Sequence, residues 1–237
     1  ESRGLGDVYK RQTLDHVFTL AHEMGHALHS YYSDSNQSYI NAGYKIFVAE
    51  VASTCNESLL IHYLLKNTDN KAEKAYLINH FLEQFKGTLY RQTMFAEFEK
   101  ITHKMVEEGE TLTSDILCKV YYDLNKQYFG EDMVLDEEIA LEWARIPHFY
   151  NPFYVYQYAT GISAAIALSK KIMEQGEAGV KDYMKFLTGG GSKAPIDLLK
   201  LAGVDMTTKE PIEKALELFK ELLDQMEQSF LSIDTNA

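Results

Sequence analysis

Two histidines and a glutamate near the start of the chain, His22, Glu23 and His26, have the spacing of the H-E-x-x-H motif. Side chains four residues apart lie on one face of an α-helix, so both imidazoles can reach a single metal ion. Glu23 follows the first histidine and can reach a water molecule held by that ion. Apolar residues recur around the motif with a helical period: Val17, Leu20, Ala21, Met24 and Leu28. The pattern predicts a zinc site on a buried helix, with a chance occurrence of the motif as the alternative.

A zinc site needs a third protein ligand, and an acidic residue on a second helix is the best candidate. Glu50 lies in the apolar segment 46–52, where a carboxylate is costly to bury unless a cation meets it. Glu57 follows on nearly the same face, where it can hydrogen-bond a ligand imidazole or else be a solvated helix residue. About 10 Å of helix separates His29 from His22, so we expect His29 to pack in the core or to support a ligand by a hydrogen bond rather than to bind the same ion.

Several segments of the chain resemble, in order, the oligoendopeptidase F branch of the thimet-type zinc oligopeptidases. These segments are 18–32, 47–54, 146–150, 153–161 and 190–192 before Pro195. The resemblance extends from about residue 13 to the end of the chain and implies that His22, His26 and Glu50 bind zinc. It also implies that Glu23 is the general base. The expected activity is hydrolysis of internal bonds in short peptides, with one zinc ion as the cofactor.

The first twelve residues do not share this resemblance. Residues 7–12 match the translation of a transposon end that is used in preparing sequencing libraries, so we expect residues 1–12 to be a non-native leader. We expect residues 13–237 to form one catalytic domain of a longer enzyme, without the N-terminal region that completes its substrate channel. Such a fragment either folds alone, binds zinc and keeps weak activity, or is an inert zinc-binding fragment.

Aromatic side chains are concentrated just after Pro147, with six of them between residues 149 and 158. Composition alone favours the beginning of a core helix whose tyrosines lie at its solvent-exposed end. A zinc peptidase, however, also needs a neutral donor or an imidazolium beside the scissile carbonyl, because an oxyanion develops there. We therefore predict that His148 supplies such a donor, together with Tyr154 and Tyr158 on one helical face. The sequence does not decide between the two tyrosines.

A helical zinc metallocarboxypeptidase with the same motif is the competing class of enzyme. It would need a cationic group to hold the terminal carboxylate of its substrate. Arg91 and Arg145 are available for this role, so the sequence alone does not exclude it.

Glycines at 189–191 precede Ser192 and give this segment the look of a phosphate-binding loop. The segment lacks the lysine of such a loop and the strand that precedes it. We therefore expect either a flexible wall or lid of the substrate channel or a plain surface turn.

Composition and charge exclude several classes of partner. The chain has 237 residues, 46% of them apolar, and its net charge of −12 argues against binding to nucleic acid or to anionic membranes. No apolar run reaches the length of a membrane span. The two cysteines, Cys55 and Cys118, are too few for a disulfide framework and are expected to be reduced. We therefore expect a cytoplasmic protein.

Helical patterns follow one another along the chain, and alternating strand patterns are nearly lacking. The predicted helices are 15–32, 43–66, 70–107, 114–127, 151–175, 195–202 and 208–230. Asn151 and Pro152 have the order of an N-cap and a first-turn proline. The third helix carries a stripe that we assign to the core: Leu77, Phe81, Phe85, Leu89, Phe95, Phe98, Ile101 and Met105. The prediction is an all-α, zincin-like catalytic domain with little or no sheet.

Overall fold

The computed structural model describes residues 13–234, so the predicted leader, residues 1–12, lies outside the described residues. The described part is helical and contains no β-strand, which confirms the all-α prediction. Its elements are α2 (Leu14–Asn36), α3 (Tyr39–Ala42), α4 (Ile46–Asn67), α5 (Lys71–Gln84), the π-helix η1 (Phe85–Tyr90), α6 (Arg91–Glu107), α7 (Ser114–Phe129), the 3₁₀-helices η2 (Glu137–Arg145) and η3 (Pro147–Tyr150), α8 (Tyr156–Gln175), α9 (Glu177–Leu187), α10 (Pro195–Leu201) and α11 (Glu210–Asp234). None of these helices combines the length and the apolar character needed to cross a membrane.

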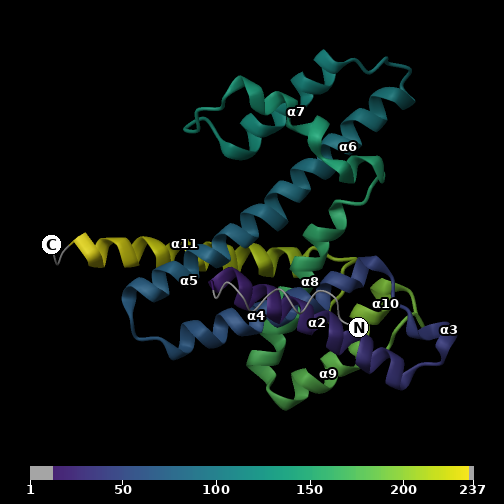
Figure 1. The fold of residues 1–237 in the computed structure, drawn as a ribbon, viewed down its shortest axis with the longest axis vertical. Helices are drawn as coiled ribbons and strands as arrows, with labels where there is room; N and C mark the ends of the chain where they lie inside the picture. Colours follow the sequence, from purple (N-terminus) through teal and green to yellow (C-terminus); the bar gives the residue numbers. More distant parts are fainter. Residues whose placement is uncertain (1–12, 235–237) are drawn as a thin grey trace. The chain divides into compact units, whose positions relative to one another are not determined.

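The helices form two compact units, which are described separately (Figure 1). The first unit consists of the described residues up to Gln84 together with those from Thr160 onward. The second unit is Phe85–Ala159. The assignment of residues 13–237 to one catalytic domain stays a prediction.

The core of the first unit is formed by α4, α8, α9 and α10. Small residues on α8 let α4 pack closely against it, and the hydroxyls of Ser58 and Ser169 form a buried hydrogen bond of 2.8 Å between these two helices. Cys55 lies in this core, where burial raises the pKa of its thiol to about 12. Cys55 and Cys118 are both free thiols, as predicted.

The stripe predicted for the third helix is buried from Leu77 to Phe98, whereas Ile101 and Met105 are only partly buried, and the helix is not regular. Leu77 and Phe81 on α5, and Phe95 and Phe98 on α6, are all buried. Between them the chain widens into the π-helix η1, which turns later side chains to a new direction around the axis. The second unit has its own core: Met94, Phe95, Phe98, Tyr121, Leu124, Ile146 and Val155.

One helix begins later than predicted, and two helices were not predicted. The helix expected from Asn151 begins only at Tyr156, and Asn151 and Pro152 lie in a bend and a turn instead. The reason is Phe153, whose φ of 57° places it in the left-handed region and stops a right-handed helix from passing through it. The polar segment after α2 contains the short helix α3, and α9 was not predicted.

The buried face of α2 is not the predicted one. Its apolar stripe is partly open to solvent, since Val17, Leu20, Met24 and Leu28 are each 38–46% exposed. The buried residues of α2 are instead Phe18, Gly25, His29 and Ser33. The prediction was wrong because helical periodicity identifies an apolar face but not the face that a neighbouring helix covers.

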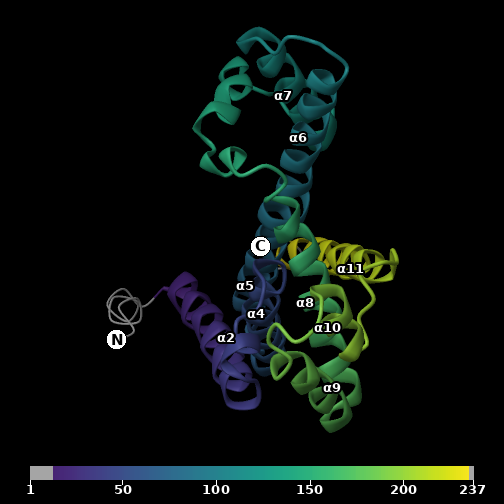
Figure 2. The same cartoon turned by 90° about the vertical axis from the view of Figure 1, so that its right-hand side faces the viewer.

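Helix α2 runs alongside α4 (Figures 1 and 2), and Gly25 faces the backbone of α4. A Cβ atom at this position would lie 2.5 Å from the Cα of Ser53 and 2.8 Å from the carbonyl oxygen of Ala52. These neighbours are backbone atoms and cannot swing aside. Gly25, the residue between Met24 and His26, therefore sets the distance between the two helices.

We predict that Gly25→Ala destabilises the chain by about 1–3 kcal/mol, because the added methyl group must push α4 away from α2. Urea denaturation measures the change in the free energy of unfolding. Gly87→Ala is the matched control, since a Cβ there meets nothing within 4 Å and should leave stability unchanged or slightly raised. Equal stability of the Gly25→Ala variant and the unmodified chain would show that the helices are not limited by this contact.

Candidate metal centre

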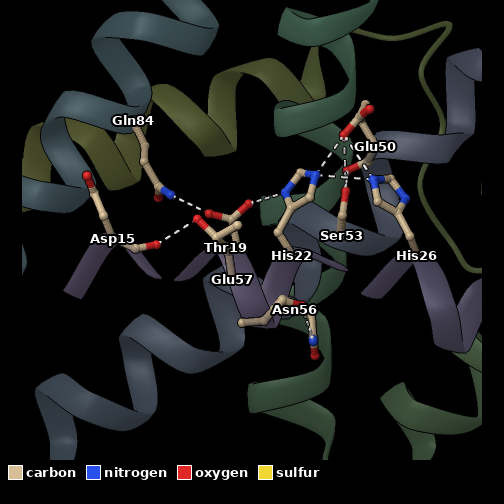
Figure 3. A network of polar contacts seen from close by, with 10 residues as sticks. Asp15, Thr19, His22, His26, Glu50, Ser53, Asn56, Glu57 and Gln84 are labelled. Carbon is tan, nitrogen blue, oxygen red and sulfur yellow. Dashed lines mark hydrogen bonds and ion pairs between the residues drawn. The ribbon is translucent and has the colours of Figure 1, made fainter. Parts of the chain in front are cut away.

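His22 and His26 project from α2 toward Glu50 on α4 (Figure 3). The two Nε2 atoms are 3.1 Å apart, and the Glu50 Oε2 atom lies 3.2 Å from Nε2 of His22 and 3.5 Å from Nε2 of His26. One ligand atom from each residue lies within 4.8 Å of the others, and all three side chains are partly buried. The structure therefore brings the three residues predicted as metal ligands to one point.

The donor atoms of this group suit a zinc ion. Two neutral imidazoles do not turn lone pairs toward each other at such a short distance unless a proton or a cation lies between them. Two imidazole nitrogens and a carboxylate oxygen form a donor set that zinc prefers, and three protein ligands leave a fourth position for water or substrate. His22, His26 and Glu50 together fit a catalytic type of zinc site.

A series of hydrogen bonds holds the Nδ1 side of the His22 ring. Its Nδ1 atom lies 2.6 Å from Oε1 of Glu57, and the side-chain amide of Gln84 donates to Oε2 of Glu57 at 2.6 Å (Figure 3). A carboxylate that accepts the Nδ1 proton fixes the tautomer whose Nε2 lone pair is free for a metal. The structure thus places Glu57 against the imidazole of the candidate ligand His22 rather than in solvent.

Further polar residues around the site were not anticipated from the sequence. The Ser53 hydroxyl lies 3.2 Å from Oε2 of Glu50, and the Asn56 amide donates to the carbonyl oxygen of Ala21 at 2.6 Å. Ser53 follows Glu50 by three residues, so helical spacing could have identified it. Gln84 comes from a different helix, and no local pattern links it to Glu57.

His29 lies in the core and not among the candidate ligands. Its ring is fully buried and stacks on Tyr44 with 3.7 Å between the ring centroids. Neither ring nitrogen has a hydrogen-bond partner among the described residues. Burial, with a smaller effect of the neighbouring His26, lowers the pKa of His29 to about 4, so the ring is neutral at physiological pH.

The ligand group is electrostatically coupled. Burial alone would lower the pKa of His22, but hydrogen bonds with Glu50 and Glu57 outweigh it and raise that pKa to about 10. Hydrogen bonds from His22 and His26 hold the pKa of Glu50 well below its ordinary value. In the absence of metal, His22 is therefore an imidazolium facing a carboxylate. A metal ion must displace this proton in order to bind.

Glu23, the predicted general base, lies next to His22 on α2 and is exposed. Within the described residues it forms no hydrogen bond or ion pair. Its carboxylate is therefore available to a water molecule or a substrate.

The second unit contains the other predicted catalytic residues, which we call the His148 cluster (His148, Tyr154 and Tyr158). The Tyr158 hydroxyl lies 3.4 Å from Nε2 of His148, and the His148 ring stacks on Tyr154 at 5.8 Å between centroids. Tyr154 precedes α8, so the prediction that the two tyrosines share a helical face was wrong. Their rings nevertheless meet edge-on at 5.6 Å. The structure groups these three residues with one another.

The two arginines considered for binding a substrate carboxylate are both engaged within the second unit. Arg91 and Arg145 each form an ion pair with Oε1 of Glu142. The Tyr121 hydroxyl donates to the other carboxylate oxygen of Glu142 at 2.6 Å. Both guanidinium groups are thus paired with Glu142, although the Arg145 side chain is 71% exposed.

The glycine-rich segment forms a turn in which Gly189 and Gly190 are buried whereas Gly191 and Ser192 are exposed, and its role as a wall or lid of the substrate channel stays a prediction. Gly190 has a φ of 51°, and a Cβ there would lie 2.3 Å from the carbonyl oxygen of Asn41. The Gly191 amide donates to the same oxygen at 2.7 Å, and the Gln37 side chain donates to the carbonyl of Thr188 at 2.7 Å. The segment is a tight connection packed on the end of α2.

Comparison with known proteins identifies relatives over most of the chain. The model of "Peptidase family M3" matches residues 10–218. Oligopeptidase PepF of Bacillus subtilis (strain 168) is 56% identical over 220 residues, which are 93% of this chain and 33% of that protein. The chromosomal oligoendopeptidase F of Lactococcus lactis subsp. cremoris is 44% identical over 216 residues, which are 91% of this chain and 36% of that protein.

A solved structure gives the same result. The crystal structure of oligoendopeptidase-F from Enterococcus faecium matches with a TM-score of 0.82 at 46% sequence identity, covering 92% of this chain and 39% of that one. This likeness confirms the zincin-like helical fold that the sequence resemblance implied. The chain spans about a third of the length of the curated relatives described above.

We predict that the metal-free chain loses stability as the pH rises from 6.5 toward 10. The pKa of His22 is raised on folding from 6.5 to about 10, so its contribution is fully present below pH 6.5 and disappears as the folded-state proton is lost. Urea denaturation of chelator-treated protein at several pH values measures this. Glu57→Gln removes one of the groups that raise the pKa, and should flatten the dependence. A pH profile of stability that is the same in both proteins would contradict the assignment.

Proposed function

The chain belongs to peptidase family M3, and from this premise we propose that it is catalytic sequence of a zinc-dependent endopeptidase that hydrolyses internal bonds of short oligopeptides. The observation that carries the proposal is the convergence of His22, His26 and Glu50 on one point. Relatives at 44–56% identity are named as oligopeptidases or oligoendopeptidases, which supports short peptides as the substrate class. Net charge of −12 argues against nucleic acid as an alternative partner.

In this proposal His22, His26 and Glu50 hold one zinc ion. A zinc ion bound there lowers the pKa of a water molecule and polarises the carbonyl group of the scissile peptide. Glu57 keeps the His22 ring in the orientation and tautomer that binding requires, and Gln84 keeps Glu57 in place.

Glu23 acts as the general base. Its carboxylate takes a proton from the attacking water, the water oxygen bonds to the carbonyl carbon, and the same proton is later delivered to the leaving amine nitrogen as the C–N bond breaks. Its position beside His22, and its freedom from other partners within the described residues, support this role.

The His148 cluster supplies hydrogen bonds to the oxyanion that forms on the carbonyl oxygen. An imidazole and tyrosine hydroxyls are suitable donors, and such donors act most strongly when they are already oriented. The contacts of His148 with Tyr154 and Tyr158 support the idea that the three residues act as a group. The hydroxyl of either tyrosine can be the donor in this proposal.

The carboxypeptidase alternative has less support. It requires a cation that is free to bind the terminal carboxylate of a substrate, and both candidate arginines are paired with Glu142. The names of the relatives also favour internal cleavage. A cytoplasmic location stays a prediction.

We predict that Glu23→Gln retains bound zinc and loses turnover by about 100-fold or more, because the amide cannot accept the proton from water. His22→Ala should lose the zinc itself. Metal analysis and a peptidase assay on the same purified samples measure both effects. Substantial activity in Glu23→Gln would show that the base is another residue, whereas an unmodified chain that holds zinc without any turnover would be the inert fragment.

We also predict that a short peptide blocked at both ends is cut at an internal bond. Mass spectrometry of the products identifies the bond. The matched control is the same peptide with a free C-terminus, which a carboxypeptidase would shorten from that end. Cleavage of the unblocked peptide alone would support the carboxypeptidase instead.

A further inference from the structure

We propose that Glu99 is a positioning residue: its carboxylate holds the turn at Phe153 in the shape that sets the geometry of the His148 cluster. The consequence for catalysis rests on the proposed function, while the geometric part does not. All the residues involved belong to the second unit.

Glu99 is a buried carboxylate with one specific contact. It projects from α6 and is only 4% exposed. Its Oε1 atom accepts a hydrogen bond of 3.0 Å from the backbone N–H of Phe153, whereas its buried Oε2 atom has no hydrogen-bond partner among the described residues. Burying a carboxylate with half of its acceptor capacity unused is unfavourable. The specific contact of this buried carboxylate is the hydrogen bond that it accepts from the Phe153 N–H.

Phe153 needs such a restraint. Its φ of 57° is in the left-handed region, and among the described residues it is the one non-glycine residue with a positive φ. This conformation is unfavourable for a residue with a Cβ atom and persists where surrounding contacts enforce it. Two residues on one face of α6 supply these contacts, because the ring of His103 also packs on the Phe153 ring at 4.6 Å between centroids.

The direction of the chain at Phe153 determines how the His148 cluster is assembled. His148 precedes this turn, Tyr154 follows it directly, and Tyr158 lies in the first turn of α8 just beyond. If φ returned to a negative value, the chain would leave the turn in another direction. Tyr154 would then move away from His148, against which it now stacks at an interplanar angle of 20°.

The contact with Phe153 requires an acceptor oxygen rather than a negative charge. Burial raises the pKa of Glu99, although the Phe153 amide and His103 oppose this change. A glutamine has the same length and an amide oxygen that can accept the same hydrogen bond. A leucine fills a similar volume without any acceptor.

The test compares Glu99→Leu with Glu99→Gln. Glu97→Ala is the matched control, because Glu97 is on the same helix and its carboxylate accepts from the Tyr128 hydroxyl at 2.9 Å, away from the turn. Circular dichroism verifies folding. The first readout is the His148 ring resonance in ¹H–¹³C NMR spectra of the histidine-labelled, zinc-supplemented chain, assigned with His148→Gln. The second readout is kcat and KM for a short peptide.

We expect Glu99→Leu to move the His148 resonance toward that of a histidine free of ring stacking and to lower kcat by about 10- to 100-fold, with KM changed much less. Glu99→Gln and Glu97→Ala should keep the resonance in place and kcat within about threefold of the unmodified chain. In a Phe153→Gly background the effect of Glu99→Leu on the resonance should shrink, because glycine adopts positive φ without restraint.

An unchanged His148 resonance in a folded Glu99→Leu variant would overturn the proposal. A shift of the His148 resonance in Glu99→Gln would also overturn the proposal, because the acceptor oxygen would then not be the essential feature. If Glu99→Leu does not fold, Phe153→Gly should restore its folding and keep the His148 resonance in place, and a double variant that still fails to fold would overturn the proposal. A shifted resonance with unchanged turnover would support the positioning and would instead refute the catalytic role of the His148 cluster.

Discussion

The close contact of α2 with α4 is the constraint on which the candidate metal centre depends. The two histidines belong to one helix and the acidic ligand to the other, so the distance between the ligand atoms follows from the distance between the helix axes. That distance is small because Gly25 presents no side chain to the backbone at Ser53. Small residues on α8 pack with α4 in the core of the first unit. The geometry of the site thus depends on the absent side chain of Gly25 and the small side chains of α8 as well as on the candidate ligands.

The polar residues around the site satisfy one another in a fixed order. Gln84 donates to Glu57, Glu57 accepts from His22, and His22 faces Glu50. Each group has a single orientation because its neighbour leaves one hydrogen-bonding choice. This arrangement orients the candidate ligand atoms toward one point, and a metal that binds there must displace the proton of His22.

Local spacing explains why the three residues of the candidate metal centre could be picked out from the sequence. His22, His26 and Glu50 are revealed by helical periodicity and by a charge in an apolar segment, and most helices follow from the same periodicity. Gln84 and Glu99 could not be predicted, because their partners come from distant segments. The left-handed φ of Phe153 has no signal in a phenylalanine, which is why the beginning of α8 was misplaced. The buried face of α2 was misjudged because the sequence does not tell which neighbour covers a helix.

The positions of the two cysteines have a practical consequence for chemical labelling. Cys55 is fully buried and its thiol is far from ionising at neutral pH, so alkylating reagents should not reach it in the folded chain. Cys118 is partly exposed on α7. A maleimide dye or a spin label would therefore attach to the second unit alone, without mutation of the native sequence. Reaction at Cys55 would in turn mark the moment at which the core of the first unit opens.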